Sequence, residues 1–277
     1  MKLYHYTTIE SFAKIWVSKQ LRFSESKNTN DLFERRKTWE LACGILPKEE
    51  DSKNLLDVIN SFGRCFSEIL SQYKQISFTL DYKNIRGCKS SMMWGQYAHN
   101  DNGVCIELDS DKLIIPTDVY KSKVRYTYDV PKIRFDKENE YLKDTYLQQF
   151  VKRNRKTIFF SKHKHWEHEN EYRLVSKCHD YLSIEGAITR VYVYDSTSMN
   201  TRVVEHIINK DVPIYFLYIS NLNGKRDIGC DSLEREREYE RKMKEEPDYY
   251  TNQKKVIKRA KEIFDKIGLP LEVNCEE

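Results

Sequence analysis

The chain has 277 residues, of which 32% are charged and 13% aromatic, and its 47 basic and 43 acidic residues leave a formal net charge of +4. This length can bury a hydrophobic core in one large domain, or in one domain with an appendage, and the aromatic content argues against disorder. The charge balance does not require a nucleic-acid partner. Seven scattered cysteines without a Cys-x-x-Cys pair indicate neither a disulfide framework nor a structural zinc site. No apolar run has the length of a signal peptide or a membrane span, so we expect a soluble cytoplasmic protein without a membrane partner.

The first third of the chain alternates predicted strands and helices. Lys2 to Tyr6 reads as a strand, followed by a helix in which Thr7 is the N-cap and Glu10 completes a capping box. A short strand is expected over 21–24 and a loop over 28–31. Two helices are expected from apolar spacing, over 33–46 and 54–74.

The remainder of the chain predicts an α+β fold with a mixed, mainly antiparallel sheet core and surrounding helices. Strands are expected over 76–80, 103–108, 119–128, 188–194 and 212–220, and helices over 90–98, 137–160 and 199–208. Residues 1–220 form the predicted body, and residues 221–277 form a charged helical tail. The apolar stripe of the last helix favours docking onto the body, while a homo-oligomer formed through the tail stays open.

One octapeptide, Trp166 to Arg173, concentrates carboxylates beside an arginine. If the chain is extended from Glu169 onward, Glu169, Glu171 and Arg173 project from the same face. Two acids and a base on one face are typical of a site, but a solvated strand edge with an ion pair would produce the same pattern. The rest of the chain has to decide between these interpretations.

Several further motifs occur in a fixed order along the chain. They are Leu3-Tyr4-His5-Tyr6-Thr7, Asn30-Asp31-Leu32-Phe33-Glu34, Met93-Trp94-Gly95-Gln96-Tyr97-Ala98, Gly103-Val104-Cys105-Ile106-Glu107 and the octapeptide itself. Together they resemble the bacterial family known as domain of unknown function 2971, close to the abortive-infection AbiGi group. The resemblance covers roughly residues 3 to 220, and His168 stands where the family usually has a tyrosine.

The layout of these motifs is also similar to the His-Tyr-Glu arrangement of ADP-ribosyltransferase folds. That similarity implies an NAD-consuming ADP-ribosyltransferase or NAD glycohydrolase that acts as a bacterial toxin or phage-defence effector, with NAD as substrate and a nucleic acid or a protein as acceptor. Breaking the nicotinamide–ribose bond passes through an oxocarbenium-like state, which a carboxylate can stabilise.

The same similarity implies roles for individual residues. The catalytic carboxylates would be Glu171 and Glu169; NAD would be held by His5 at a ribose, by Tyr97 or Tyr6 stacked on nicotinamide, and by Arg22 or Arg173 at the pyrophosphate. Each position also has a structural interpretation: His5 and Tyr97 as core residues, Arg173 as the ion-pair partner of Glu169. For Asn30, Asp31 and Glu34, a turn and helix start is favoured over a substrate contact.

Two other functions stay open. His163, His165 and His168 could bind a metal for a nuclease that also uses Glu167 and Glu169, although no single regular conformation gathers the three imidazoles. The acid-free stretch 152–164 could bind nucleic-acid phosphates, or form the solvated face of a helix. The third function is a non-catalytic regulator of defence.

Overall fold

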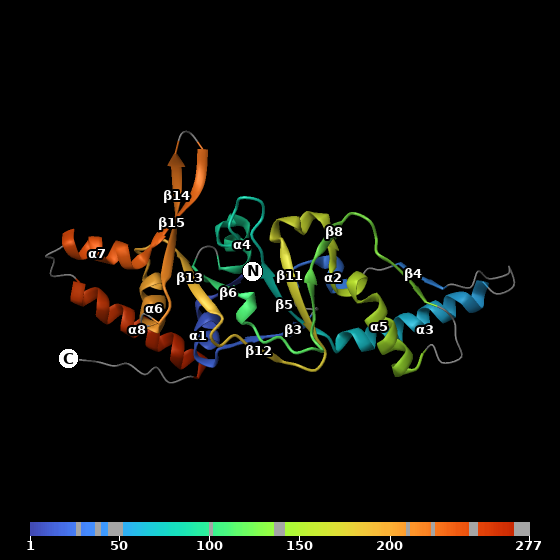
Figure 1. Cartoon of the computed structure of the whole chain (residues 1–277). Helices are drawn as coiled ribbons and strands as arrows, with labels where there is room; N and C mark the ends of the chain where they lie inside the picture. Colours follow the sequence, from blue (N-terminus) through green and yellow to red (C-terminus); the bar gives the residue numbers. More distant parts are fainter. Residues whose placement is uncertain are drawn as a thin grey trace. The chain divides into compact units, whose positions relative to one another are not determined.

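The computed structural model describes residues 1–25, 29–36, 40–43, 52–99, 102–135, 142–208, 211–222, 225–243 and 249–268. The fold is α+β with a mainly antiparallel sheet, as predicted (Figure 1). The chain divides into two compact units. The first comprises Met1–Leu21, Phe78–Ile114 and Ser183–Glu277, and the second comprises Arg22–Ser77 and Ile115–Leu182. Within the described ranges, no helix is both long and apolar enough to cross a bilayer.

The first unit is built on a run of five adjacent strands. Their order is β15 (Lys225–Ser232), β14 (Ile214–Leu222), β13 (Ile188–Tyr194), β6 (Val104–Asp109) and β1 (Lys2–Thr7). β1 pairs antiparallel with β6 over its whole length, and Tyr4 also lies opposite Thr79 at the end of β5 (Lys74–Thr79). β13 and β14 are parallel because α6 (Met199–Ile208) carries the chain back between them.

Helices cover this run of strands and bury its apolar side chains. They are α1 (Ile9–Ser18), η3 (Gly87–Lys89), α4 (Ser91–Tyr97), η4 (Ser110–Lys112), α6, α7 (Leu233–Met243) and α8 (Tyr249–Ile267). α8 packs against α6 and α1, and four of its residues are buried: Val256, Ala260, Ile263 and Phe264. The predicted apolar stripe is therefore covered within this unit. The domain boundary predicted at 220 and 221 stays a prediction; these residues belong to β14.

The start of α1 corrects one detail of the sequence analysis. Thr8, not Thr7, is the N-cap, and its side chain accepts a hydrogen bond from the backbone N–H of Ser11. Thr7 is instead the last residue of β1 and pairs with Val104. Two adjacent threonines satisfy the same capping pattern, and the length of the strand pairing decides between them.

The second unit contains the remaining elements. They are β2 (Gln20–Arg22, shared at the boundary), β3 (Ser24–Glu25), α2 (Leu32–Arg36), β4 (Glu40–Cys43), α3 (Ser52–Ser71), β7 (Tyr120–Lys123), β8 (Arg125–Thr127), β9 (Lys132–Phe135), α5 (Asp144–Phe159), β10 (Ser161–His163), η5 (Lys164–Glu169), β11 (Glu171–Ser176) and β12 (Tyr181–Ser183). β11 pairs antiparallel with β7, β3 pairs antiparallel with β5, and β8 runs parallel to β10.

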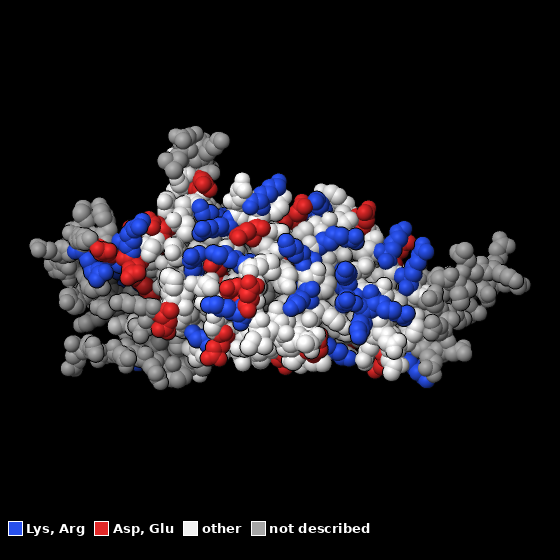
Figure 2. Space-filling model, viewed as in Figure 1, with Lys and Arg blue, Asp and Glu red and all other residues white. Residues whose placement is uncertain are grey.

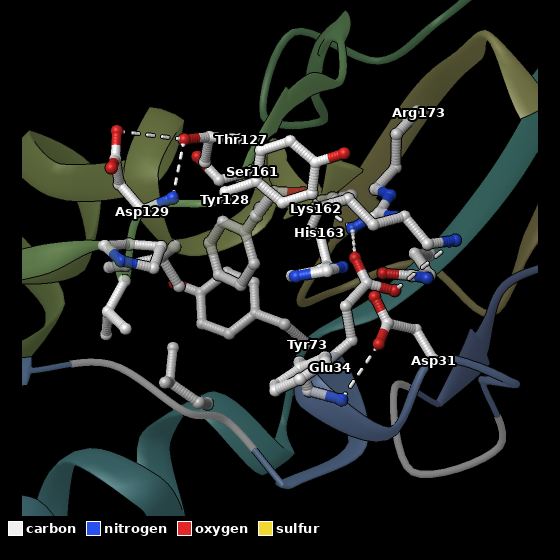
Figure 3. A pocket seen from close by; sticks show the side chains of 18 of the residues that line it. Asp31, Glu34, Tyr73, Thr127, Tyr128, Asp129, Ser161, Lys162, His163 and Arg173 are labelled. Atoms are coloured by element: carbon white, nitrogen blue, oxygen red, sulfur yellow. Dashed lines mark hydrogen bonds and ion pairs between the residues drawn. The ribbon is translucent and has the colours of Figure 1, made fainter. Parts of the chain in front are cut away.

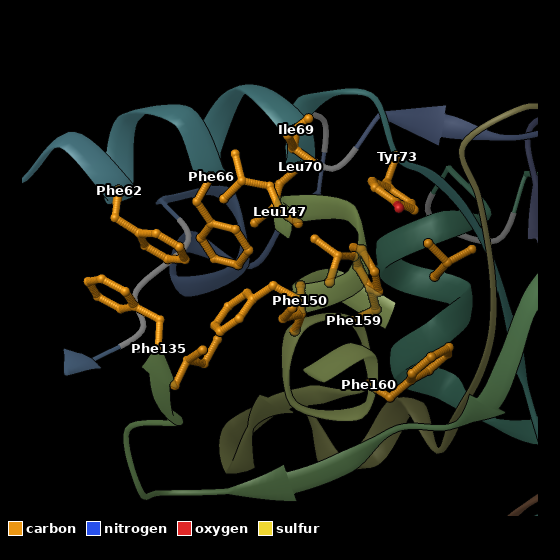
Figure 4. Close-up of a cluster of buried hydrophobic side chains, with 14 residues drawn as sticks. Phe62, Phe66, Ile69, Leu70, Tyr73, Phe135, Leu147, Phe150, Phe159 and Phe160 are labelled. Carbon is orange, nitrogen blue, oxygen red and sulfur yellow. The ribbon is translucent and has the colours of Figure 1, made fainter. Parts of the chain in front are cut away.

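An aromatic core holds α3, α5 and β9 of this unit together (Figure 4). The rings of Phe62 and Phe135 stack with centroids 3.9 Å apart, and Phe150 meets Phe62 edge-on at 5.2 Å. Aromatic pairs in these geometries add to the stabilisation from burial itself. This core anchors the helix that precedes the charged residues described below.

Three predicted elements of the second unit differ in the structure. The helix expected over 33–46 ends at Arg36, and residues 40–43 form β4, because they pair with β9 from Glu40 opposite Lys132 to Cys43 opposite Phe135. The strand expected over 119–128 is divided into β7 and β8. The helix expected over 137–160 begins at Asp144; residues 136–141, like 37–39 and 44–51, lie outside the described residues.

Candidate functional site

Glu171 and Arg173 project from the same face of β11, as the alternation predicts, and both are buried. Glu169 reaches the same region by another route. It lies at the end of the 3₁₀ helix η5, and Asn170, with φ of 42°, turns the chain between η5 and β11. The prediction of an extended chain from Glu169 is therefore wrong. Because all three residues are at most 4% exposed, the interpretation as a solvated strand edge is also wrong.

Arg173 is the centre of a buried network. Its Nε and Nη2 donate to the two carboxylate oxygens of Glu171 at 2.6 and 2.7 Å, and its Nη1 donates to Glu34 at 2.6 Å and to the carbonyl of Phe159 at 2.8 Å. This bidentate geometry is the strongest form of an arginine–carboxylate pair. The acids surrounding it raise the pKa of Arg173 against the opposing effect of burial. Its ion pairs among the described residues are with Glu171 and Glu34, whereas the structural interpretation named Glu169.

Lys162 supplies the second buried cation. Its Nζ lies 2.5 Å from Glu169, 3.7 Å from Glu171 and 3.9 Å from Glu34. Burial by itself would lower the pKa of Lys162, but the neighbouring carboxylates outweigh it and raise the pKa. The ring of Trp166 lies 4.9 Å from the same ammonium, close enough for a cation–π contact.

Glu171 is held as a carboxylate by its surroundings. Burial raises its pKa, but Arg173, Lys162 and the hydroxyl of Ser77, which donates to Glu171 at 2.5 Å, together lower it to about 2. The backbone N–H of Glu171 donates to the hydroxyl of Tyr126 at 2.9 Å. Glu171 is therefore charged at neutral pH and fixed in position.

A pocket of about 340 Å³ opens beside this network, within the second unit (Figure 3). Such a volume is at the lower end of the range for small-molecule sites. Four of the charged lining residues, Asp31, Glu34, Lys162 and Arg173, belong to this network or adjoin it, and Lys74 and Asp129 also line the pocket. The aromatic lining residues are Phe33, Tyr73, Tyr128, Phe159 and His163. Figure 3 shows Asp31 and Glu34 close to Lys162. The pocket thus combines aromatic walls with a charged end.

Asp31 brings a buried carboxylate oxygen to the pocket lining. The residue is 0% exposed, and its Oδ1 accepts from the backbone N–H of Phe33 at 2.8 Å, which starts α2. Its Oδ2 is buried and has no hydrogen-bond partner among the described residues. A buried carboxylate oxygen without a partner is costly, and a ligand that donates a hydrogen bond would remove that cost.

The structure divides the predicted site residues between the two units. Glu169, Glu171 and Arg173 come together as described, and Arg22 ends β2 with an exposed side chain. His5, Tyr6 and Tyr97 belong to the first unit. There Tyr6 is buried and donates to the carbonyl of Gly87 at 2.5 Å, while Tyr97 packs against the same apolar cluster. His5 contacts Phe78 edge-on at 6.0 Å.

The three histidines of the alternative metal site do not converge on a common point. The ring of His163 stacks on Phe33 at 4.8 Å, and His165 meets His163 edge-on at 4.4 Å. His168 Nδ1 lies 3.1 Å from the carbonyl of His165, and its ring stacks with Trp166. Among the residues that the structure describes, no group of three His, Cys, Asp or Glu side chains is placed to hold a metal ion.

The functional positions of Lys162, Asp31 and Glu34 are not evident from the sequence pattern. Lys162 looked like one more member of a basic surface stretch, although in β10 it alternates with less buried neighbours and points inward. The motif around Asp31 and Glu34 predicts a turn and a helix start. That interpretation holds locally, since Asp31 does start α2, but both residues also line the pocket.

Comparison with known proteins yields one match. The family model described as "Protein of unknown function (DUF2971)" matches residues 93–174, from α4 through most of β11. The unknown-function domain recognised from the motifs is supported over this segment. No curated protein matches the chain, and no solved structure does.

Proposed function

We propose that the pocket of the second unit binds the nicotinamide riboside half of NAD and breaks the bond between nicotinamide and ribose. The observation that carries this proposal is the buried Oδ2 of Asp31, for which no described residue is a hydrogen-bond partner, at the charged end of an aromatic pocket. Nicotinamide in NAD is a planar cationic ring, which aromatic faces bind well. A ribose hydroxyl is the kind of donor that Asp31 lacks.

The charges around the pocket suit the reaction. Asp31, Glu34, Glu169 and Glu171 outnumber Lys162 and Arg173, and the charges of Lys74 and Asp129 cancel, so the formal charge is −2. A negative, preorganised environment stabilises the positive charge that develops on the ribose as the bond breaks. The bonding electron pair leaves with the nicotinamide nitrogen, and the ribose C1′ is captured by water or by a hydroxyl of an acceptor. The proton released by that nucleophile passes to a pocket carboxylate and then to solvent.

In this proposal the acids have different roles. Asp31 and Glu34 line the pocket and contact the ribose, whereas Glu171 and Glu169 hold Arg173 and Lys162 in place. Glu171 is thus a positioning residue rather than the group that touches the substrate. The NAD contacts predicted for His5, Tyr6, Tyr97 and Arg22 stay predictions.

The test is release of nicotinamide from NAD by the purified full chain, followed by chromatography. We expect Asp31→Asn and Glu34→Gln to lower the rate by about a hundredfold, which is the usual contribution of a positioned carboxylate. Asp129→Asn is the matched control, because Asp129 also lines the pocket but is exposed at the pocket's rim. There its carboxylate accepts a hydrogen bond from the hydroxyl of Thr127. Its rate should stay within about threefold of wild type, as expected for a rim residue with no transition-state contact. Absence of nicotinamide release by the wild type would refute the proposal, as would full activity of Asp31→Asn.

The resemblance to the abortive-infection group supports a role for this activity in phage defence, with the chain acting as a toxin. Induction of the wild-type chain in a bacterial host should then deplete NAD and arrest growth, and Asp31→Asn should do neither. Growth arrest without NAD loss would separate toxicity from the proposed chemistry.

A non-catalytic regulator is the second candidate. It is favoured by the internal pairing of Glu171 with Arg173, which needs no ligand to be satisfied. A regulator would bind NAD or nicotinamide without releasing a product. Calorimetric binding together with a nicotinamide release rate equal to that of buffer would favour this candidate over the transferase.

A further inference from the structure

The surface of the second unit carries a concentration of positive charge that the proposed chemistry does not use. The segments 119–128 and 152–164 contain no acidic residue. Arg125, Lys152 and Lys156 from these segments are exposed, as are Lys121 and Lys123 on β7. Figure 2 shows Lys and Arg gathered, with few acids between them, over the region where Figure 1 draws β8, β11 and α5. We call these five residues the basic surface.

Backbone and side-chain contacts tie the segments of the basic surface together. The N–H of Arg125 donates to the carbonyl of Phe160 at 2.8 Å, directly after α5, and the N–H of Phe160 in turn donates to the carbonyl of Lys156 at 3.2 Å. The guanidinium of Arg155 lies over the ring of Tyr120 at 5.8 Å, which links α5 to β7. The positive charges therefore come from one folded surface rather than from a mobile tail. Among the described residues, no salt bridge involves the five members of this surface.

A group of aromatic rings continues from the basic surface to the mouth of the pocket. β8 and β10 are parallel, with Arg125 opposite Ser161 and Thr127 opposite His163, so Tyr128 follows at the same end as His163. Tyr128 meets His163 and His165 edge-on at 5.6 and 5.9 Å, and His163 stacks on Phe33 at 4.8 Å. Tyr128 is 68% exposed and Phe33 48%. We call these four rings the aromatic group.

We propose that the second unit binds single-stranded nucleic acid, with its phosphates on the basic surface and its bases on the aromatic group. Positive charge along a surface combined with exposed rings is the combination by which proteins hold unpaired strands, because every base has a face that can stack. A duplex keeps its bases stacked on one another and would use only the basic surface. A membrane would likewise be attracted by charge alone, and it would not depend on Tyr128. Since Tyr128, His163 and Phe33 also line the pocket, the bound strand would pass its mouth.

Fluorescence anisotropy with a fluorescein-labelled 20-nucleotide oligo-dT, and with a duplex of equal length, tests this proposal. Arg125→Glu combined with Lys156→Glu should weaken binding of the single strand at least about tenfold. Lys14→Glu combined with Lys112→Glu is the control, because it removes two exposed lysines of the first unit at the same change in net charge. This control should lower affinity by no more than about twofold, through net charge alone.

The aromatic group is tested separately from the charge. Tyr128→Ala should weaken binding of the single strand about tenfold and leave binding of the duplex unchanged. Tyr181→Ala is its control, since Tyr181 is 56% exposed in the same unit but is not part of the group. Circular dichroism and thermal melting of each variant separate loss of binding from loss of fold.

Three outcomes would overturn the proposal. They are no binding of oligo-dT at 50 mM salt, equal loss of affinity in the Arg125/Lys156 variant and its control, and binding to phosphatidylserine vesicles without binding to the oligonucleotide. These outcomes do not depend on NAD, so they test the proposed nucleic-acid surface independently of the proposed cleavage of NAD.

Discussion

Replacing Glu171 with glutamine tests whether the buried charge network stabilises the fold. The substitution keeps the shape of the side chain but removes the charge that faces Arg173 at 2.6 and 2.7 Å and Lys162 at 3.7 Å. Removing one partner of a buried pair costs about 3–5 kcal/mol, since the remaining charge is left without full compensation. Glu34 still contacts Arg173 at 2.6 Å, so we expect a loss near the lower end of that range.

The lowered pKa of Glu171 implies a stabilisation free energy of similar size. It falls from an ordinary value of 4.5 to about 2 in the folded protein, which corresponds to about 3 kcal/mol of stability at neutral pH. Because the folded pKa is the lower one, this stabilisation is present above pH 4.5 and is lost as the pH falls toward 2. At pH 3 about 2 kcal/mol of it is already gone. Glutamine does not titrate, so the difference between the two proteins should narrow with acidity.

Urea denaturation followed by circular dichroism measures the loss of unfolding free energy at pH 7 and its decrease at pH 3. Glu167→Gln is the control, because Glu167 pairs with Lys164 at the surface, where both side chains are more than a third exposed; such a pair contributes at most about 1 kcal/mol. A loss for Glu171→Gln of less than about 1 kcal/mol at pH 7 would refute the reasoning, since it would equal that of a surface pair. An equally large loss at pH 3 would contradict the assigned pKa.

Three further predictions concern packing and reactivity. Gly103→Ala should lower the free energy of unfolding by about 1–3 kcal/mol, because the new Cβ would lie 2.3 Å from a backbone oxygen. Gly95→Ala should instead raise the free energy of unfolding by up to about 1 kcal/mol, because Gly95 lies in helix α4 and no atom lies within 4 Å of the new Cβ. Phe62→Ala should cost about 3–5 kcal/mol, because Phe62 is fully buried and stacked on a second ring. Iodoacetamide should modify exposed Cys178 well before Cys88, whose pKa burial raises to about 12.

Thermal melting measures the first two of these predictions, and peptide mass spectrometry the third. Equal melting temperatures for the two glycine variants would contradict the close approach at Gly103. A loss for Phe62→Ala no greater than for Leu56→Ala, which truncates a side chain 62% exposed on the same helix, would contradict the role of the aromatic core. Modification of Cys88 at the rate of Cys178 would mean that the first unit opens more readily than its packing implies.

Elements with strong local patterns were predictable from the sequence with their bounds. β13 and α6 occupy the predicted residues, because alternating β-branched and aromatic residues mark the strand and a 3.6-residue apolar period marks the helix. β4 was not predictable. Its residues Glu40 to Cys43 have an apolar pattern that also suits a helix, and the pairing partner that makes them a strand lies in β9, about ninety residues later.

The candidate site shows the same division. The shared strand face of Glu171 and Arg173 was predictable from the amino-acid order, since alternation along a strand is a local property of the backbone. The burial of this face and the addition of Glu34 and Lys162 to the network follow from the three-dimensional packing. So does the buried Oδ2 of Asp31, which has no hydrogen-bond partner in the described part of the chain. The physical reason is that burial and charge pairing depend on residues far apart in the chain, from Asp31 to Arg173, which come together only when the second unit folds.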